Sequence, residues 1–287
     1  MNSPDVREAI TQIRKLPTLP AVLGQILATT ADPDSSAADL GRLIENDQSL
    51  SAALLRIANS AYYGYPRQIK SITAAIVRLG FYEMRKLALA ATAFRSLSAG
   101  RSDYDRVQLW RHAIATAIAT ERLAGMLGIS NEACFVSGLL HDIGKVVLDK
   151  LYPGPFRTAA RQAHAQHKFV RETECDLFKL DHAQAGAFLA EHWELPPEIV
   201  EAIRYHHAPG LNAIDPALVN LVALANFTAY QAGLGESSNG RPALLPETAA
   251  IALNIGEPQW SRASNALKRS QDQINDFLSA ITGAPGA

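Results

Sequence analysis

The spacing of apolar residues along the chain is the feature that most limits its fold. In segments such as 44–57 and 72–79, apolar side chains recur every three or four residues, which places them on one face of a helix. No segment between turn signals alternates apolar and polar residues with a sustained period of two, as a half-buried strand would. The sequence therefore predicts an all-α protein with essentially no sheet.

Helix boundary signals divide the chain into regions. Gly80 is a stop signal after the helix expected at 72–79, and Pro196-Pro197 begin another helix, because proline is tolerated in a first turn. The polar stretches 100–105 and 236–242 are typical of loops. We expect a first helical module over residues 1–99, a second over 106–235 and a C-terminal helical extension over 246–282.

The composition is that of a soluble globular protein, and we expect the protein to be cytoplasmic. Of the 287 residues 48% are hydrophobic and 19% are charged, which argues against a disordered chain. The net charge of -1 gives no electrostatic reason to bind nucleic acid or an anionic membrane. The N-terminus lacks an apolar segment behind a basic start, so we expect no secretory signal. The uncharged run 216–235 contains polar residues such as Asn220 and Gln231, which favours a buried helix over a membrane span.

His141 and Asp142, in the segment Val136-Ser-Gly-Leu-Leu-His-Asp-Ile-Gly-Lys145, point most directly to chemistry. An adjacent His and Asp at the end of an apolar helix can present an imidazole nitrogen and a carboxylate oxygen to one divalent metal. Gly144 then releases the helix, and Lys145 adds a positive charge where a phosphate could lie. Metal-dependent phosphohydrolases start from this arrangement.

Further histidines occur in order on successive predicted helices. Taken singly, each is more often a hydrogen-bonded structural histidine than a metal ligand. Their ordered series favours a shared site formed with His141 by His112, His182, His206 and His207. We expect His164, His167 and His192 to be ordinary surface residues.

Several segments together resemble the HDOD domains, which are similar to the HD superfamily of metal phosphohydrolases. The resemblance covers roughly residues 9–230 and rests on segments 16–20, 54–64, 69–80, 110–112, 138–145 and 193–196, together with the segment around His182. It implies an N-terminal helical bundle packed on an HD-like helical bundle, followed here by C-terminal helices. HDOD domains are signalling modules of bacterial regulators, and most are not known to be enzymes.

The resemblance also implies a set of metal ligands. The first metal would be held by His112, His141 and Asp142, and the fourth ligand, usually an aspartate, falls at Asn226. Asparagine offers a neutral carbonyl oxygen, so it removes one negative charge and weakens a hard-cation site. Positions like His182, His206 and His207 serve further metals in the related HD-GYP phosphodiesterases. Here Ala208-Pro209-Gly210 stands in place of the glycine-tyrosine-proline signature, which argues against hydrolysis of a cyclic dinucleotide.

Two functions follow from these residues. The first is a bacterial regulatory protein that acts through protein–protein interaction, with an unidentified signalling partner and a possible homo-oligomeric state. Its metal site would be incomplete, structural or regulatory, holding one divalent iron, zinc or manganese. The alternative is a metal-dependent phosphodiesterase or nucleotidase, with Lys145 as a candidate phosphate contact. The sequence favours the non-catalytic function, because the possible general bases Asp181, Glu174 and Glu121 are equally compatible with solvated helix faces.

Overall fold

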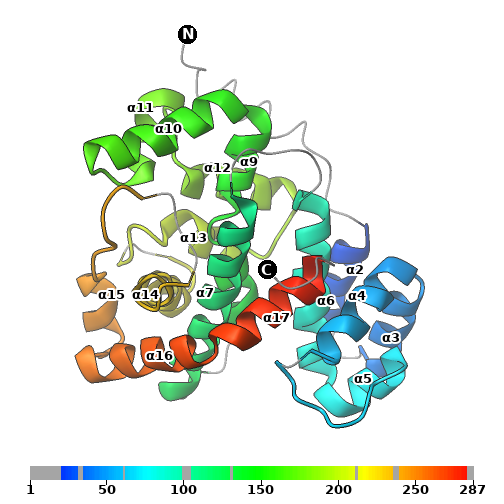
Figure 1. Cartoon of the computed structure of the whole chain (residues 1–287). Helices are drawn as coiled ribbons and strands as arrows, with labels where there is room; N and C mark the ends of the chain where they lie inside the picture. The colour runs from blue at the N-terminus through cyan, green and yellow to red at the C-terminus, as the bar shows by residue number, and fades with distance from the viewer. Residues whose placement is uncertain are drawn as a thin grey trace. The chain divides into compact units, whose positions relative to one another are not determined.

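The computed structural model describes residues 21–31, 35–60, 62–98, 105–129, 132–210, 213–234 and 239–282, and all regular structure within them is helical (Figure 1). This confirms the all-α prediction. Residue contacts divide the chain into two compact units. The first unit includes Arg101–Arg269, and the second combines Pro17–Gly100 with Ser270–Ala287.

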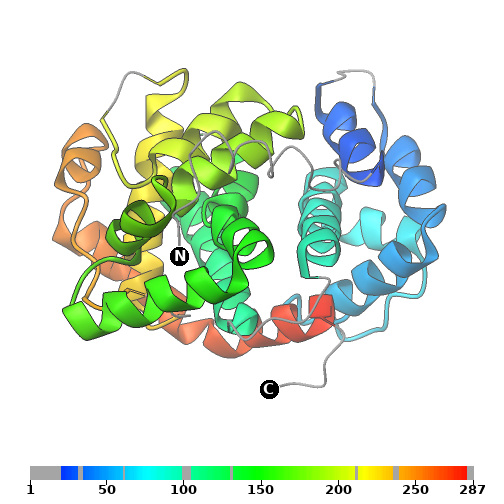
Figure 2. The same cartoon turned by 90° about the horizontal axis from the view of Figure 1, so that it is seen from above.

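The second unit is built around α6 (Phe81–Ser98), and Figure 2 shows its blue and cyan helices gathered beside that helix. The helices that contact α6 are α2 (Ala21–Ala31), α3 (Ala37–Glu45), α4 (Gln48–Ala58), α5 (Ile72–Leu79) and α17 (Gln271–Thr282). Leu54, Met84 and Leu87 are buried in this core. Gly80 ends α5 at a φ of 90°, a conformation that side chains other than glycine rarely adopt, which confirms the predicted stop signal.

The first unit has α7 (Arg106–Met126) and α14 (Pro216–Gln231) at its centre. These two helices pack against each other, and both also contact α8 (Ala133–Leu140) and α16 (Glu257–Arg269). The short helix α15 (Glu247–Ala252) lies on α14. Most of α14 is buried, as predicted for the uncharged run. Among the described residues no helix has the length and apolarity needed to cross a membrane.

The remaining helices of the first unit are α9 (Ile143–Leu151), α10 (Pro153–Gln166), α11 (Val170–Phe178), α12 (His182–His192) and α13 (Pro197–Tyr205). Among them, α13 packs on α14 and α8, α12 packs on α9 and α13, and α10 packs on α9 and α11. Gly144 in α9 lies so close to α12 that a Cβ atom there would be 1.8 Å from the carbonyl oxygen of His182. There is also no room for a Cβ atom at Gly138 in α8, because it would lie 2.7 Å from Cα of Ala117 in α7. These two glycines allow the backbones to approach closely enough for side chains at the helix ends to meet.

Candidate metal centre

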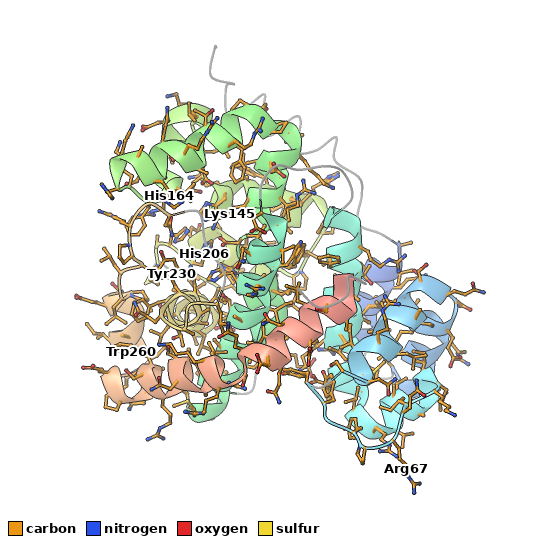
Figure 3. The ribbon with its side chains drawn as sticks, viewed as in Figure 1. Arg67, Lys145, His164, His206, Tyr230 and Trp260 are labelled. Carbon is orange, nitrogen blue, oxygen red and sulfur yellow. The ribbon has the colours of Figure 1, made fainter. Side chains whose placement is uncertain are left out.

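The seven residues predicted as metal ligands come from five separate helices or turns of the first unit. His112 lies within α7, and Asn226 lies within α14. His141 and Asp142 occupy the turn between α8 and α9, at the C-cap of one helix and the N-cap of the next. The others lie at helix ends: His182 begins α12, and His206 and His207 follow α13. Figure 3 shows Lys145 and His206 in the interior of this unit.

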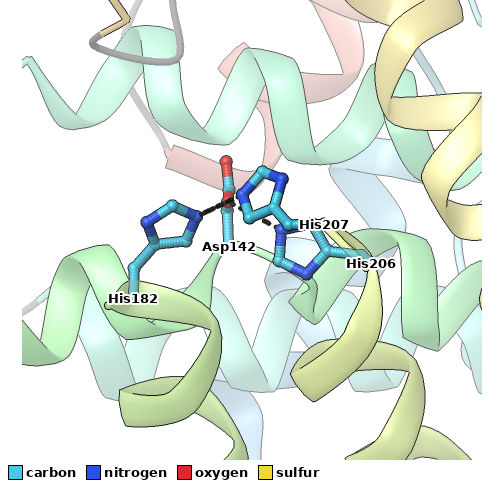
Figure 4. A group of neighbouring side chains, drawn as sticks. All are labelled: Asp142, His182, His206 and His207. Atoms are coloured by element: carbon cyan, nitrogen blue, oxygen red, sulfur yellow. Dashed lines mark hydrogen bonds and ion pairs between the residues drawn. The ribbon is translucent and has the colours of Figure 1, made fainter. Parts of the chain in front are cut away.

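The carboxylate of Asp142 is the point at which the imidazoles converge (Figure 4). Its Oδ1 lies 3.2 Å from Nε2 of His182 and 3.7 Å from Nε2 of His206. Its Oδ2 lies 3.4 Å from Nε2 of His141 and 4.0 Å from Nε2 of His112. The two oxygens therefore face different pairs of histidines.

Two groups of possible ligands share Asp142. The first subsite consists of His112, His141 and Asp142, and the second consists of Asp142, His182, His206 and His207. Within each group the ligand atoms lie within 4.8 Å of one another, which is close enough for one ion to contact all of them. Oδ1 of Asn226 lies 2.9 Å from Nε2 of His112 and so extends the first subsite. All seven side chains thus meet in space, and their role as metal ligands stays a prediction.

Hydrogen bonds behind the imidazoles aim their Nε2 atoms at Asp142. Nδ1 of His141 donates to the carbonyl oxygen of Gly138 at 2.7 Å, and Nδ1 of His206 donates to that of Ile203 at 2.7 Å. Because these Nδ1 atoms carry the hydrogen, each Nε2 presents a lone pair. Backbone carbonyls hold metal-binding histidines in proteins in the same way.

Buried polar atoms without partners test whether a metal fits. Nε2 of His141, Nε2 of His206 and Oδ1 of Asp142 are buried and form no hydrogen bond. Leaving such atoms unsatisfied costs about 1–3 kcal/mol each. A divalent cation bound to them would remove this cost, and imidazole-rich sites suit zinc or iron better than magnesium. The residues present therefore fit a transition metal.

The charge states of these groups favour coordination. Burial lowers the pKa of His112 and of His206 to about 4, and it holds the pKa of His207 well below its usual value. Burial also acts to raise the pKa of Asp142, but His141 and Lys145 outweigh it and hold that pKa well below its usual value. Near neutral pH His112, His206 and His207 are thus neutral imidazoles beside an ionised carboxylate, the protonation states that metals require.

His182 is the exception among these histidines. Burial lowers its pKa, but the carboxylate of Glu174 more than offsets that effect and raises the pKa to about 9. Oε2 of Glu174 lies 2.6 Å from Nδ1 of His182 and also accepts a hydrogen bond of 2.9 Å from its backbone N–H. On the other side of the ring, Nε2 of His182 lies 2.8 Å from Nε2 of His207.

The sequence interpretation of Glu174 as compatible with a solvated face is wrong, because its side chain is completely buried. Its neighbours Cys175 and Asp176 are exposed, and the local sequence Glu-Thr-Glu-Cys-Asp looks polar throughout. A signal was nevertheless present. Glu174 lies four residues after Val170 and four before Phe178, and this spacing places it on the same buried face of α11.

Lys145 occupies a different position from the one expected of a phosphate contact. It is 2% exposed, and its Nζ lies 2.6 Å from Oδ2 of Asp142. The ammonium group has three donors, so this ion pair alone does not decide whether it also meets a phosphate. That contact stays a prediction.

A cavity of about 380 Å³ reaches the centre from outside. Three centre residues, His206, His207 and Asn226, form part of its lining. The other lining residues include one cation, polar groups and aromatic rings, among them Arg171, Tyr230, Asn239, Phe169 and Phe227. Small molecules thus have a route to the side chains that face the candidate metals.

Three solved structures share this fold. A structure of an HDOD domain protein with unknown function from Geobacter sulfurreducens is 26% identical, with a TM-score of 0.78, and the match covers 98% of this chain and 99% of that one. A provisionally assigned signal transduction protein from Marinobacter aquaeolei VT8 is 24% identical, with a TM-score of 0.82, over 96% of this chain and 65% of that one. A provisionally assigned phosphohydrolase from Shewanella amazonensis SB2B is 24% identical, with a TM-score of 0.76, over 95% and 98%.

The chain spans less than half the length of the curated relatives it matches, 42% of one and 27% of another. A family model, however, matches most of the chain itself. That model describes the HDOD domain and matches residues 16–209, which include every candidate ligand except Asn226. The chain therefore belongs to the HDOD domain family.

Proposed function

We propose that this chain is a bacterial regulatory HDOD protein whose first unit binds a divalent transition metal and whose output passes through a protein partner. The observation that carries the proposal is that the candidate ligands come from five separate helices or turns and gather around buried Asp142. One ion would join the first residue of α12 to the turns after α8 and α13. Metal occupancy would therefore control how firmly these helices are held together.

A regulatory role follows from that coupling. Without an ion, the unpartnered atoms of His141, His206 and Asp142 weaken the packing at the point where the helices meet. With an ion bound, the same atoms would coordinate it and hold the helices together. The packing of α12 and α13, and hence the surface that these helices present, would then depend on metal supply. The resemblance in fold to a provisionally assigned signal transduction protein supports this proposal.

Hydrogen–deuterium exchange of metal-free and metal-loaded protein tests the regulatory role. Mn²⁺, Zn²⁺ and Fe²⁺, the last under anaerobic conditions, are the metals to load. We expect slower exchange in α9, α12 and α13 on loading, with little change in α3 and α4 of the second unit. Exchange that is the same in both states throughout the first unit would contradict a regulatory metal.

A second function is favoured by the cavity that opens on His206, His207 and Asn226. A bound metal supplies an activated water for hydrolysis of a phosphate ester. Arg171 in the cavity lining would bind the negative charge of such a substrate, and Lys145 would keep Asp142 ionised. The aromatic lining would hold an apolar part of the substrate and exclude water.

Hydrolysis of p-nitrophenyl phosphate and bis-p-nitrophenyl phosphate by the metal-loaded protein separates the two functions. The regulatory proposal predicts no turnover above that of an Asp142→Asn variant. Turnover that requires both Asp142 and Arg171 would overturn the non-catalytic part of the proposal and leave metal binding intact. An Arg161→Gln variant is a matched control, because Arg161 is exposed on α10 and does not line the cavity.

A further inference from the structure

Glu174 is a buried carboxylate that belongs to neither group of candidate ligands. Its side chain has no exposure, and it lies in α11 between buried Val170 and Phe178. Thr173 beside it donates a hydrogen bond of 2.9 Å to the carbonyl oxygen of Ala159, which fixes α11 on α10. Burying an acidic group costs free energy unless the group is paired. We therefore expect Glu174 to have a hydrogen-bonded partner inside the protein.

That partner is His182. Oε2 of Glu174 contacts both Nδ1 and the backbone N–H of His182, at 2.6 Å and 2.9 Å. The side chain thereby fixes both the first residue of α12 and the orientation of its ring. Nε2 is left pointing at Oδ1 of Asp142, 3.2 Å away. A carboxylate behind a histidine raises the basicity of the ring as a metal ligand.

The histidines near Asp142 differ in what holds them from behind. Nδ1 of His141 and of His206 meet neutral backbone carbonyls, and Nδ1 of His112 lies 3.4 Å from the carbonyl oxygen of Leu234. Among these four imidazoles, His182 is the one whose Nδ1 meets a charged group within the described part of the chain. The second subsite therefore receives a negative charge through His182 that the first subsite lacks.

The two oxygens of Asp142 increase this difference. Oδ2, which faces His112 and His141, is already paired with Nζ of Lys145 at 2.6 Å. Oδ1, which faces His182 and His206, forms no hydrogen bond. A cation at the first subsite must compete with the ammonium group of Lys145 for its Asp142 oxygen. A cation at the second subsite displaces only the ring proton of His182, which lies 3.2 Å from an oxygen that accepts no hydrogen bond.

We infer that Glu174 is a positioning residue of an asymmetric two-metal centre. Glu174 contacts Nδ1 of His182 and thereby gives the second subsite a negative charge. The first subsite has no such charge, because Asn226 is neutral. The second subsite, Asp142 with His182, His206 and His207, then binds its metal more tightly than the first. This inference rests on the proposed metal binding and assigns an order to its two subsites.

Titration of metal-free protein with Co²⁺ tests the order, because visible absorption of Co²⁺ reports its ligands and competition with a chelator reports its affinity. Wild type should show a tight class of site and a weaker class. His207→Ala should remove the tight class, and His112→Ala should remove the weaker one. The reverse assignment, or two classes of equal affinity, would overturn the inference whether or not variants at Glu174 fold.

Glu174→Gln tests the positioning role directly, since the glutamine oxygen can still accept both hydrogen bonds but carries no charge. We expect the affinity of the tight class to fall by about 10–100-fold, with a changed Co²⁺ spectrum and little change in the weaker class. Glu174→Asp keeps the charge but shortens the reach, so it should restore affinity only in part. Asn226→Asp should tighten the weaker class alone.

Glu191→Gln is the control, because it makes the same chemical change at an exposed position of the helix that carries His182. It should leave both classes unchanged. Equal weakening of both classes by Glu174→Gln, or a tight class within twofold of wild type, would show that Glu174 has a structural role only. If wild type binds no Co²⁺ at all, the proposed function itself fails, which is a different result from either of these.

Discussion

Nζ of Lys145 lies 2.6 Å from Oδ2 of Asp142, and both side chains are almost completely buried. This ion pair places a positive charge on the carboxylate oxygen that faces His141 and His112. In the metal-free protein it balances a charge that would otherwise be buried alone. A metal bound to Asp142 would compensate part of the same carboxylate charge.

Replacing Lys145 by methionine should therefore affect the two states differently. In metal-free protein the change leaves Asp142 without its cation, and we expect a loss of about 3–5 kcal/mol in the free energy of unfolding. In metal-loaded protein the loss should be clearly smaller, because the metal compensates the carboxylate. Urea unfolding of both states measures the difference. Equal losses in the two states would indicate that no metal contacts Asp142.

Metal uptake by the second subsite should release a proton. The pKa of His182 is raised to about 9, so below that pH its ring is protonated in the metal-free protein. A metal at Nε2 must displace this proton, and the apparent affinity should fall about tenfold for each pH unit below 9. Titration calorimetry in buffers of different ionisation enthalpy counts the protons. Affinity that does not change between pH 7 and 9 would contradict coordination by His182.

The metal-free protein should be most stable near the usual histidine pKa of 6.5. His112 and His206 have folded pKa values of about 4, so their unfolded forms bind protons more readily. Their contribution to stability is present above pH 6.5 and is lost as the pH falls towards 4. His182 has the opposite sign: its contribution is present below pH 6.5 and is lost as the pH rises through about 9.

Thermal unfolding of metal-free protein across pH 4 to 9 measures this profile. We expect the melting temperature to decline on both sides of its maximum. A His206→Asn variant should flatten the acid side, since it removes one buried group that must become protonated. A melting temperature that rises steadily from pH 6.5 to pH 9 would contradict the pairing of His182 with Glu174.

Gly144 should tolerate no side chain. A Cβ atom there would lie 1.8 Å from the carbonyl oxygen of His182 and 2.6 Å from the backbone nitrogen of Gly186, so α9 and α12 would have to separate. We expect Gly144→Ala to lower the free energy of unfolding by about 3 kcal/mol or more and to weaken metal binding.

Gly125→Ala is the matched control for Gly144→Ala. Gly125 also lies in a helix, in the last turn of α7, and a Cβ atom there would meet nothing within 4 Å. Because alanine restricts the unfolded chain more than glycine does, this variant should gain up to about 1 kcal/mol. Chemical denaturation and metal titration of the two variants provide the comparison. Similar behaviour of both would show that the approach of α9 to α12 does not position the centre.

The sequence predicted the helices well because their signals are local. The spacing of apolar residues around Leu54 and the positive φ needed at Gly80 depend only on neighbours in the chain. The adjacent His141 and Asp142 pointed to the centre for the same reason. Local patterns do not state how close two helices lie, so the approach of Gly144 to α12 came from the structure.

Two features of the centre were beyond such patterns. Glu174 lies in a polar run of residues, and its burial depends on α11 packing on α10, so sequence spacing alone gave only a weak signal. The separate roles of the two Asp142 oxygens depend on distances of 2.6 Å to Lys145 and 3.2 Å to His182. Neither distance can be read from the order of residues, although both follow from how the helices pack.

The metal content of the purified protein, by elemental analysis, tests the central claim most directly when wild type is compared with Asp142→Asn. Asp142 is shared by both subsites, so its loss should remove both metals. We predict near-stoichiometric iron, zinc or manganese in wild type and almost none in the variant. Wild type that contains no more metal than Asp142→Asn, even after incubation with each metal, would contradict the account.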